Sequence, residues 1–238
     1  MTTVIAVTST ASLATPWDWC LAILSIVLID IVLAGDNAVV IALAVRRLEK
    51  KERLWGIVIG SGMAVVLRVG LTFVAAQLLA INYVKLIGGL LIVWIAVQLL
   101  LENTDGTEGK GEARNLWHAV WLITVADITM SLDNVLAVAG ASKGSFGLLL
   151  FGLGLSIPLV VFTSNLLAKL MDRYPVIIYV GSALLGKVGG SMIMTDQLIV
   201  SAFDPEPWLI HAIEGLLAIG VILVALALRR ARRKSGAD

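Results

Sequence analysis

Two octets in the chain repeat one acidic pattern: DIVLAGDN at 30–37 and DITMSLDN at 127–134. Each octet supplies two carboxylates and a carboxamide, and hydroxyl groups lie close to the second one. Such oxygen donors suit Mn²⁺, Mg²⁺ or Ca²⁺ and disfavour Cu⁺ or Zn²⁺, which prefer sulfur or imidazole ligands. The candidate metal ligands are Asp30, Asp36, Asn37, Asp127, Asp133 and Asn134, with Thr124, Thr129 and Ser131 as neighbouring hydroxyls.

The composition around these octets is that of a membrane protein. Hydrophobic residues make up 59% of the 238 residues, charged residues 15%, and the mean hydropathy is +0.96. The apolar residues form runs close to the ~20 residues that a helix needs to cross a bilayer. The single cysteine, Cys20, excludes an intrachain disulfide, and a cleaved signal peptide is not expected. We therefore predict an all-α polytopic membrane protein with seven transmembrane helices, at about 18–45, 54–80, 83–101, 116–141, 146–168, 176–195 and 208–228.

The basic residues predict the orientation. Of 18 lysines and arginines, 14 fall in segments that seven spans place on one side, and only Lys85 and Lys143 fall on the other. By the positive-inside rule the N-terminus is outside and the C-terminus cytoplasmic. The basic tail at 229–238 is expected to rest on anionic lipids of the inner leaflet rather than on nucleic acid.

The two octets belong to a repeat. A shift of 97 residues, from Asp30 to Asp127, also superposes the second aspartate and the asparagine of each octet. Since each half holds three spans, the halves have opposite orientations in the membrane, as in many secondary transporters. We predict a 3+3 inverted repeat in one membrane domain, with repeat one at about 18–101, repeat two at about 116–195, and a seventh helix at about 208–228.

The repeat also predicts how deep the four aspartates lie in the membrane. Asp30 and Asp127 fall near mid-membrane, Asp36 on the cytoplasmic side of that level and Asp133 on the outer side. Four such carboxylates cost on the order of 10–14 kcal/mol before compensation, and a divalent cation cancels two charges at once. The alternative is structural: the aspartates cap helix breaks or pair with Arg68, and the asparagines hold helices together.

Three further residues have possible coupling roles. Arg68 lies inside a predicted span, where it could occupy the vacated site during the return step or serve as a fixed ion-pair partner. His211 and Glu214 are three residues apart on one face of the seventh span, near its outer end, and could pass a proton or a metal ion outward. A plain polar pair at the membrane interface is the alternative for these two.

No enzyme is expected, because no catalytic or phosphate-binding motif appears. The residues favour a secondary transporter for a divalent cation, with no permanently bound cofactor and with protons as the natural counter-ion. The alternative is a non-transporting scaffold that supplies metal to exported or secretion-associated proteins. A homo-oligomer or a membrane protein partner stays open.

The segments GDNAVVIALA at 35–44 and SLDNVLAVAG at 131–140 resemble the paired signature of the TerC family of bacterial integral membrane proteins, in its YjbE-like branch. The resemblance covers essentially the whole chain. It implies a seven-helix fold in the bacterial inner membrane and a link to manganese export or to metal supply for exported enzymes. The family name comes from tellurite resistance, but an acidic midplane would repel that oxyanion, so an effect on tellurium resistance is expected to be indirect.

Overall fold

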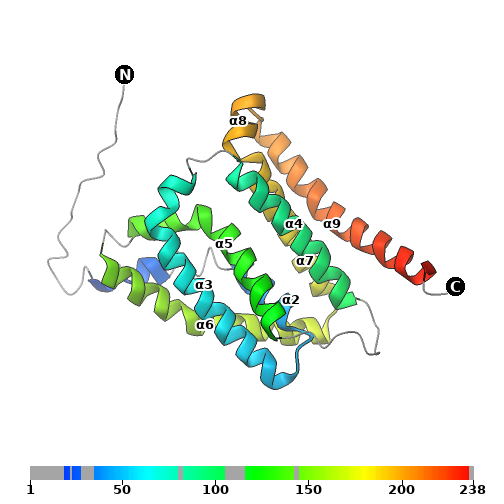
Figure 1. Cartoon of the computed structure of the whole chain (residues 1–238), viewed down its shortest axis with the longest axis horizontal. Coiled ribbons are helices and arrows are strands. Elements are labelled where there is room, and N and C mark those ends of the chain that lie inside the picture. Colours follow the sequence, from blue (N-terminus) through cyan, green and yellow to red (C-terminus); the bar gives the residue numbers. More distant parts are fainter. Residues whose placement is uncertain are drawn as a thin grey trace.

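The structure is a computed structural model that describes residues 19–21, 23–27, 35–79, 83–104, 116–141 and 145–235 (Figure 1). The side chains of residues 132–141 are not part of this description. Residues 19–21 and 23–27 are helical, and within the described ranges no strand occurs, so the predicted all-α class is confirmed there. The labelled helices are α2 (Gly35–Val45), α3 (Lys50–Leu79), α4 (Val84–Thr104), α5 (Leu116–Ala141), α6 (Phe146–Arg173), α7 (Val176–Met194), α8 (Gln197–Phe203) and α9 (Pro207–Ser235).

Within the described ranges, five helices are long and apolar enough to cross a membrane, and they match five of the predicted spans. The qualifying stretches are Lys51–Thr72, Val84–Asn103, Phe146–Arg173, Val176–Met194 and Pro207–Ala231. The other two predicted spans, 18–45 and 116–141, contain the shorter apolar stretches Gly35–Val45 and Leu116–Ser131. The chain is thus a multi-pass membrane protein, while the seven-span count and the inverted repeat stay predictions.

The structure differs from the prediction in two places near the end of the chain: it contains one additional short helix, and its last helix is longer. The acidic loop between the last two predicted spans contains α8, whose N-cap is Asp196: its carboxylate accepts a hydrogen bond from Leu198 N at 2.9 Å. The last helix was predicted to end at 228 but continues to Ser235. Arginine and lysine are good helix formers, so the charges that end the apolar run do not end the helix.

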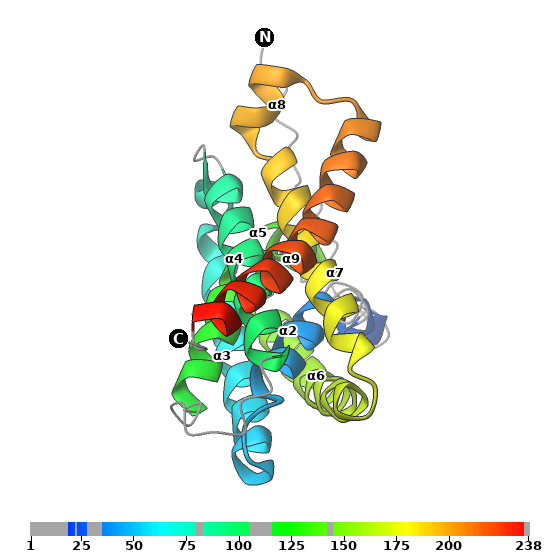
Figure 2. The ribbon, with the colours of Figure 1, turned by 90° about the vertical axis from the view of Figure 1, so that its right-hand side faces the viewer.

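The helices form two groups that Figures 1 and 2 show from two sides. On the right of Figure 1, α4, α7 and α9 run side by side, with α7 packed extensively on both neighbours. On the left, α3 packs extensively on α5, and α6 contacts both α3 and α2. The two groups meet mainly where α5 contacts α4 and where α2 contacts α7. Because α2 also packs against α5 and α6, it lies within the left-hand group.

An ion-pair network joins four helix ends at one end of the molecule. Asp172, near the end of α6, pairs with Arg46 at 3.0 Å and with Arg53 at 2.8 Å. Asn103, near the end of α4, donates a hydrogen bond to Leu43 O at 3.1 Å and accepts one from Arg46 Nη1. The segments around 46–53, 103 and 172 therefore share one end, as the prediction of a common cytoplasmic side requires.

At the opposite end of the molecule, hydrogen bonds to one carboxylate join two helices. Asp196, 1% exposed, accepts a second hydrogen bond from Leu86 N at 3.1 Å, in the first turn of α4. One carboxylate therefore holds the start of α4 next to the start of α8. The prediction places both segments on the outer face.

Helices α4 and α7 cross closely at Gly89 and Gly189. A Cβ atom added to Gly89 would lie 2.6 Å from the carbonyl oxygen of Gly189, and one added to Gly189 would lie 2.8 Å from that of Gly89. Such approach of two backbones is the usual role of small residues in membrane helix packing. Side chains larger than hydrogen do not fit at this point.

Gly89→Ala is therefore expected to destabilise the protein by about 1–3 kcal/mol, the usual cost of overpacking. The measurement is thermal unfolding of the purified protein in detergent. Gly70→Ala in α3 is the matched control, because nothing lies within 4 Å of a Cβ added there. Equal melting temperatures for the two variants would show that the α4–α7 crossing is loose.

Candidate metal site

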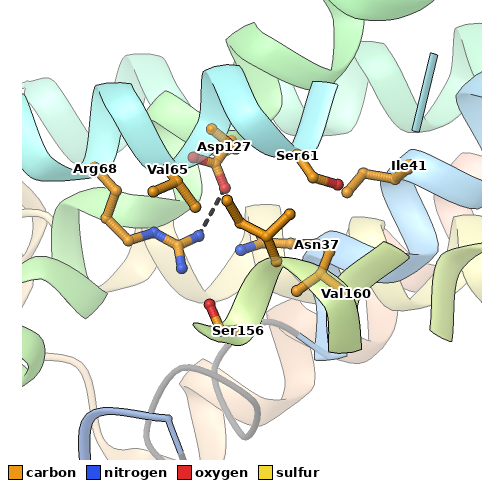
Figure 3. A pocket seen from close by; sticks show the side chains of 10 residues that line it. Asn37, Ile41, Ser61, Val65, Arg68, Asp127, Ser156 and Val160 are labelled. Atoms are coloured by element: carbon orange, nitrogen blue, oxygen red, sulfur yellow. Dashed lines mark hydrogen bonds and ion pairs between the residues drawn. The ribbon is translucent and has the colours of Figure 1, made fainter. Parts of the chain in front are cut away.

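A small buried cavity lies among α2, α3, α5 and α6 (Figure 3). The volume open to the centre of a water molecule is about 20 Å³, enough for one or two waters. A second cavity of about 10 Å³ borders the same two polar residues, Asn37 and Asp127. The lining residues of the larger cavity are Asn37, Ile41, Ser61, Ala64, Val65, Arg68, Asp127, Ser156, Ile157 and Val160.

Arg68 and Asp127 form a buried ion pair at one edge of this cavity. The guanidinium Nη2 lies 2.8 Å from Asp127 Oδ1, and both side chains are 4% exposed. Ser131, one turn further along α5, completes a triangle: its hydroxyl accepts from Arg68 Nε at 3.2 Å and donates to Asp127 Oδ2 at 3.2 Å. The pair compensates two charges that would each be costly in the membrane. Arg68 thus has the ion-pair geometry that was one of its two predicted roles.

Asn37 has a different environment. Its side chain is 5% exposed, and neither its carboxamide nitrogen nor its oxygen has a hydrogen-bond partner among the described residues. Ser61 Oγ, on the α3 side of the cavity, is also buried without a partner there. A buried polar group without a partner costs about 1–3 kcal/mol. Both groups line a space in which a cation or a water molecule would satisfy them.

Asn103 is as buried as Asn37 but differs from it in its hydrogen bonds. It is also 5% exposed, but its carboxamide nitrogen donates to Leu43 O and to Leu99 O, at 3.1 and 2.8 Å. Asn103 therefore joins α4 to α2, which is the structural role that was the alternative for membrane asparagines. Asn37 has no such contact in the described part of the chain.

Asn37→Leu is expected to leave thermal stability unchanged or raised, because it removes a polar group without a partner, and to weaken Mn²⁺ binding at least tenfold. Asn103→Leu is the matched control and should lose stability, because it removes two hydrogen bonds that join helices, to Leu43 O and from Arg46 Nη1, and a third within α4. Both variants are measured by thermal unfolding and by Mn²⁺ titration in detergent. A large loss of stability in Asn37→Leu would give that residue the structural role instead.

The cavity lies at mid-depth if Val45 and Leu116 mark one membrane interface. Asn37 is eight residues from Val45, and Asp127 is eleven from Leu116, which correspond to about 12 and 16 Å of helix. Half the hydrocarbon thickness is ~15 Å. The walls are otherwise aliphatic, so the polar groups act in a low dielectric, where a carboxylate attracts a cation strongly.

The hydroxyls of Thr124 and Thr129 do not complete the donor set, because neither threonine lines either cavity. They donate to Val120 O and Val125 O of their own helix, at 2.7 and 2.8 Å. The described donors around the cavity are thus one carboxylate, one carboxamide and two serine hydroxyls. Among the described residues, no group of three or more histidine, cysteine, aspartate and glutamate side chains is placed to hold a metal ion.

Of the four other predicted ligands, the structure describes the side chain of Asp36 alone. Asp36, a predicted ligand, is half-buried in the first turn of α2 and does not line either cavity. It lies close enough to Lys187 of α7 for the lysine charge to act on it. Asp30 lies outside the described residues, and the side chains of Asp133 and Asn134 are outside the description too. Their roles as ligands stay predictions.

His211 and Glu214 contact each other, as their spacing predicts. His211 Nδ1 lies 3.3 Å from Glu214 Oε2; the histidine side chain is 76% exposed and that of the glutamate 9%. Glu214 is buried against α7, where a Cβ added to Gly190 would lie 3.0 Å from Glu214 Cα. This pair is separate from the cavity, whose lining includes no residue of α9.

Two polar residues of the lining, Ser61 and Ser156, are not among the predicted site residues. Ser61 lies between two glycines in GSG at 60–62, and Ser156 lies two residues before Pro158 inside α6. The hydroxyl of Ser156 donates to Leu153 O at 2.7 Å. Proline removes a hydrogen bond from the helix interior. A serine beside glycine or proline in an apolar run is the signal that could have marked both.

Comparison with known proteins gives one family. The model described as "Integral membrane protein TerC family" matches residues 15–235. YjbE of Bacillus subtilis strain 168, an uncharacterized membrane protein, is 40% identical over 208 residues, which cover 87% of this chain and 94% of YjbE. YkoY of the same strain is 25% identical over 198 residues, 75% of this chain and 60% of YkoY. The inner membrane protein YgdQ of Escherichia coli K12 is 25% identical over 196 residues, 75% of this chain and 82% of YgdQ. No solved structure matches significantly.

Proposed function

The chain belongs to the TerC family of integral membrane proteins, and YjbE and YgdQ are bacterial membrane proteins. We propose that this chain is a secondary transporter of the bacterial plasma membrane that exports a divalent metal cation, with Mn²⁺ the favoured ion. Asp127 and Asn37 would bind the ion from two helices, with Asp30, Asp36, Asp133 and Asn134 as further ligands. The N-terminus would be outside and the C-terminus cytoplasmic.

One observation carries this proposal. The carboxylate of Asp127, which pairs with Arg68, and the carboxamide of Asn37, which has no hydrogen-bond partner among the described residues, come from different helices and line one cavity near mid-membrane depth. Ionisable groups inside a membrane domain mark ion pathways by default, because structure alone rarely justifies their cost. The cavity and its oxygen donors fit a small hard or borderline cation.

The size of the cavity supports Mn²⁺ over its competitors. Mg²⁺ gives up its water molecules reluctantly and usually keeps several, whereas the cavity has room for one or two. Ca²⁺ takes six to eight oxygen ligands, more than the described donors and waters supply. An oxygen-ligated ion that dehydrates more readily than Mg²⁺ and accepts fewer ligands than Ca²⁺ fits best.

The helix packing supports an inverted repeat as the basis of transport. If α2, α3 and α4 correspond to α5, α6 and α7, then each helix contacts its counterpart: α2 packs against α5, α3 against α6, and α4 against α7. The exchanged pairs correspond too, since α3 packs against α5 and α6 against α2. This is the pattern expected when a twofold axis in the membrane plane passes through the interface of the halves, where transporter sites lie.

Arg68 would act as the counter-charge of the empty site. With the cation absent, the guanidinium neutralises Asp127, and an arriving Mn²⁺ would compete with it for the carboxylate. If the guanidinium withdraws as Mn²⁺ binds, the charge of the site rises by one unit on loading instead of two. The return of the empty transporter would therefore need fewer protons than the number of carboxylates implies.

Transport of Mn²⁺ in proteoliposomes of each orientation tests the proposal, with Mg²⁺, Ca²⁺ and Zn²⁺ as competing ions. Saturable Mn²⁺ flux that exceeds Mg²⁺ flux at equal concentration is the expected result. Binding of Mn²⁺ without flux would favour the scaffold that delivers metal to partner proteins. Neither binding nor flux would contradict both functions.

A further inference from the structure

A second group of metal-binding side chains lies away from the cavity, where the end of α4 meets the start of α5. Gln98 and Glu102 are one turn apart on α4, and His118 is the third residue of α5. His118 is nine residues before Asp127, about 13 Å along the helix. None of the three residues lines the central cavity.

The three side chains converge on one point. Gln98 Nε2 lies 2.9 Å from Glu102 Oε1 and 3.4 Å from His118 Nε2, and His118 Nε2 lies 3.8 Å from Glu102 Oε1. A half-turn of the Gln98 amide exchanges its nitrogen for its oxygen, which gives three electron-pair donors at these positions. Neighbouring ligands of a metal ion with bonds of ~2.1 Å are about 3.0–3.4 Å apart, so a shift of a few tenths of an ångström would complete the arrangement.

The local electrostatics favour a cation at this point. Glu102 lies in the last turn of α4, which ends at Thr104, and the C-terminal end of a helix dipole attracts positive charge and disfavours a carboxylate. The side chains of Glu102 and His118 are 28% and 42% exposed, so the group lies at the surface of the helix bundle. A bound cation would interact favourably with both the carboxylate and the helix end.

We propose that Gln98, Glu102 and His118 form a second binding site for a divalent transition-metal ion, at the membrane end predicted to be cytoplasmic. The donors are one imidazole nitrogen and two oxygens, and water would complete the coordination of Mn²⁺ or a similar ion. The site shares no ligand with the cavity, so this inference goes beyond the proposed function and does not depend on transport. If the chain does export metal, this site lies where the ion would first be captured.

The site also adjoins the ion-pair network at the same end. The residue after Glu102 is Asn103, which contacts Arg46 and the backbone of α2. A metal ion on Glu102 would therefore lie next to the contact that holds the end of α2, the helix that carries Asn37.

The two histidines of the chain, His118 and His211, allow a direct test. The full-length protein, purified in detergent with a tag that lacks histidine, is loaded with Mn²⁺ and measured by electron spin-echo envelope modulation, which detects a coordinated ¹⁴N nucleus. We expect imidazole nitrogen modulation in the wild type, in the matched control His211→Gln and in Asp127→Asn. It should disappear in His118→Gln.

Glu102→Gln gives an independent readout that keeps the size of the side chain. Mn²⁺ titration should show one class of site weakened at least tenfold in this variant, while any binding at the cavity is unchanged. Absence of nitrogen modulation in the wild type at saturating Mn²⁺, or its persistence in His118→Gln, would overturn the proposal. So would wild-type affinity at every site in Glu102→Gln, even if His118→Gln did not fold. A variant that loses Mn²⁺ flux but keeps the imidazole nitrogen modulation would have a defect in the central cavity and not in this second site.

Discussion

Asp127→Asn is expected to reduce Mn²⁺ flux in proteoliposomes at least a hundredfold and to lower the thermal stability of the protein. The loss of one carboxylate contact to a divalent ion in a low dielectric amounts to several kcal/mol, and each ~1.4 kcal/mol is a factor of ten in affinity. The stability effect has a separate cause. Arg68, 4% exposed, would keep a buried charge without its carboxylate, and breaking such a pair from one side costs about 3–5 kcal/mol.

The double variant Arg68→Gln with Asp127→Asn separates these two effects. It removes both charges and leaves two amides that can hydrogen-bond, so stability should return toward that of the wild type. Flux should stay absent, because the ligand is still missing. Near-normal flux in Asp127→Asn would rule out this carboxylate as a ligand. Recovery of flux in the double variant would show that Asp127 serves only to neutralise Arg68.

Arg68→Gln alone is expected to bind Mn²⁺ at least tenfold more tightly than the wild type and yet to export it more slowly. The guanidinium and the ion compete for Asp127, and at an effective dielectric constant of ~20 two unit charges ~4 Å apart interact by about 4 kcal/mol. Removing the competitor therefore strengthens binding. Export slows because the ion is released less readily and because the empty site now carries an uncompensated carboxylate.

Equilibrium Mn²⁺ titration in detergent and flux in proteoliposomes measure these two effects separately. Arg68→Lys is the matched control: it keeps the charge but loses the planar group that contacts both Asp127 and Ser131, so its affinity should lie between the other two. Unchanged or weaker Mn²⁺ binding in Arg68→Gln would make Arg68 a purely structural partner of α5.

The sequence predicted most helix boundaries because bilayer thickness limits the length of an apolar run. The run at 176–195 corresponds to α7 at Val176–Met194, and the run at 83–101 to α4 at Val84–Thr104. It did not predict α8, because seven residues are too few for a periodic pattern and the helix depends on the Asp196 cap. Hydropathy detects spans but not the short helices that lie between them.

The candidate site could be predicted in part, because charge inside a span is rare enough to be noticed. Asn37 and Asp127 line one cavity, as the repeat of the two octets suggested. The partner of Asp127 could not be chosen from sequence, since Arg68 comes from another helix and helix rotation decides what it meets. The group of Gln98, Glu102 and His118 was missed for the same reason: each residue is unremarkable alone, and only the packing of α4 on α5 brings them together.

The separation of the helices into two groups has an evolutionary consequence. Every described residue that lines the cavity belongs to α2, α3, α5 or α6, whereas α4, α7 and α9 form the other group. Under the proposed function, selection on the first group would act on polarity at single positions, because one altered donor would change which ions are accepted. Selection on α4 and α7 would act on volume, as at the crossing of Gly89 and Gly189, and would tolerate exchange among apolar residues elsewhere. Transporters built on this plan could therefore diverge widely along α9 and still carry the same ion, while a change of ion would begin with a few substitutions in the other four helices.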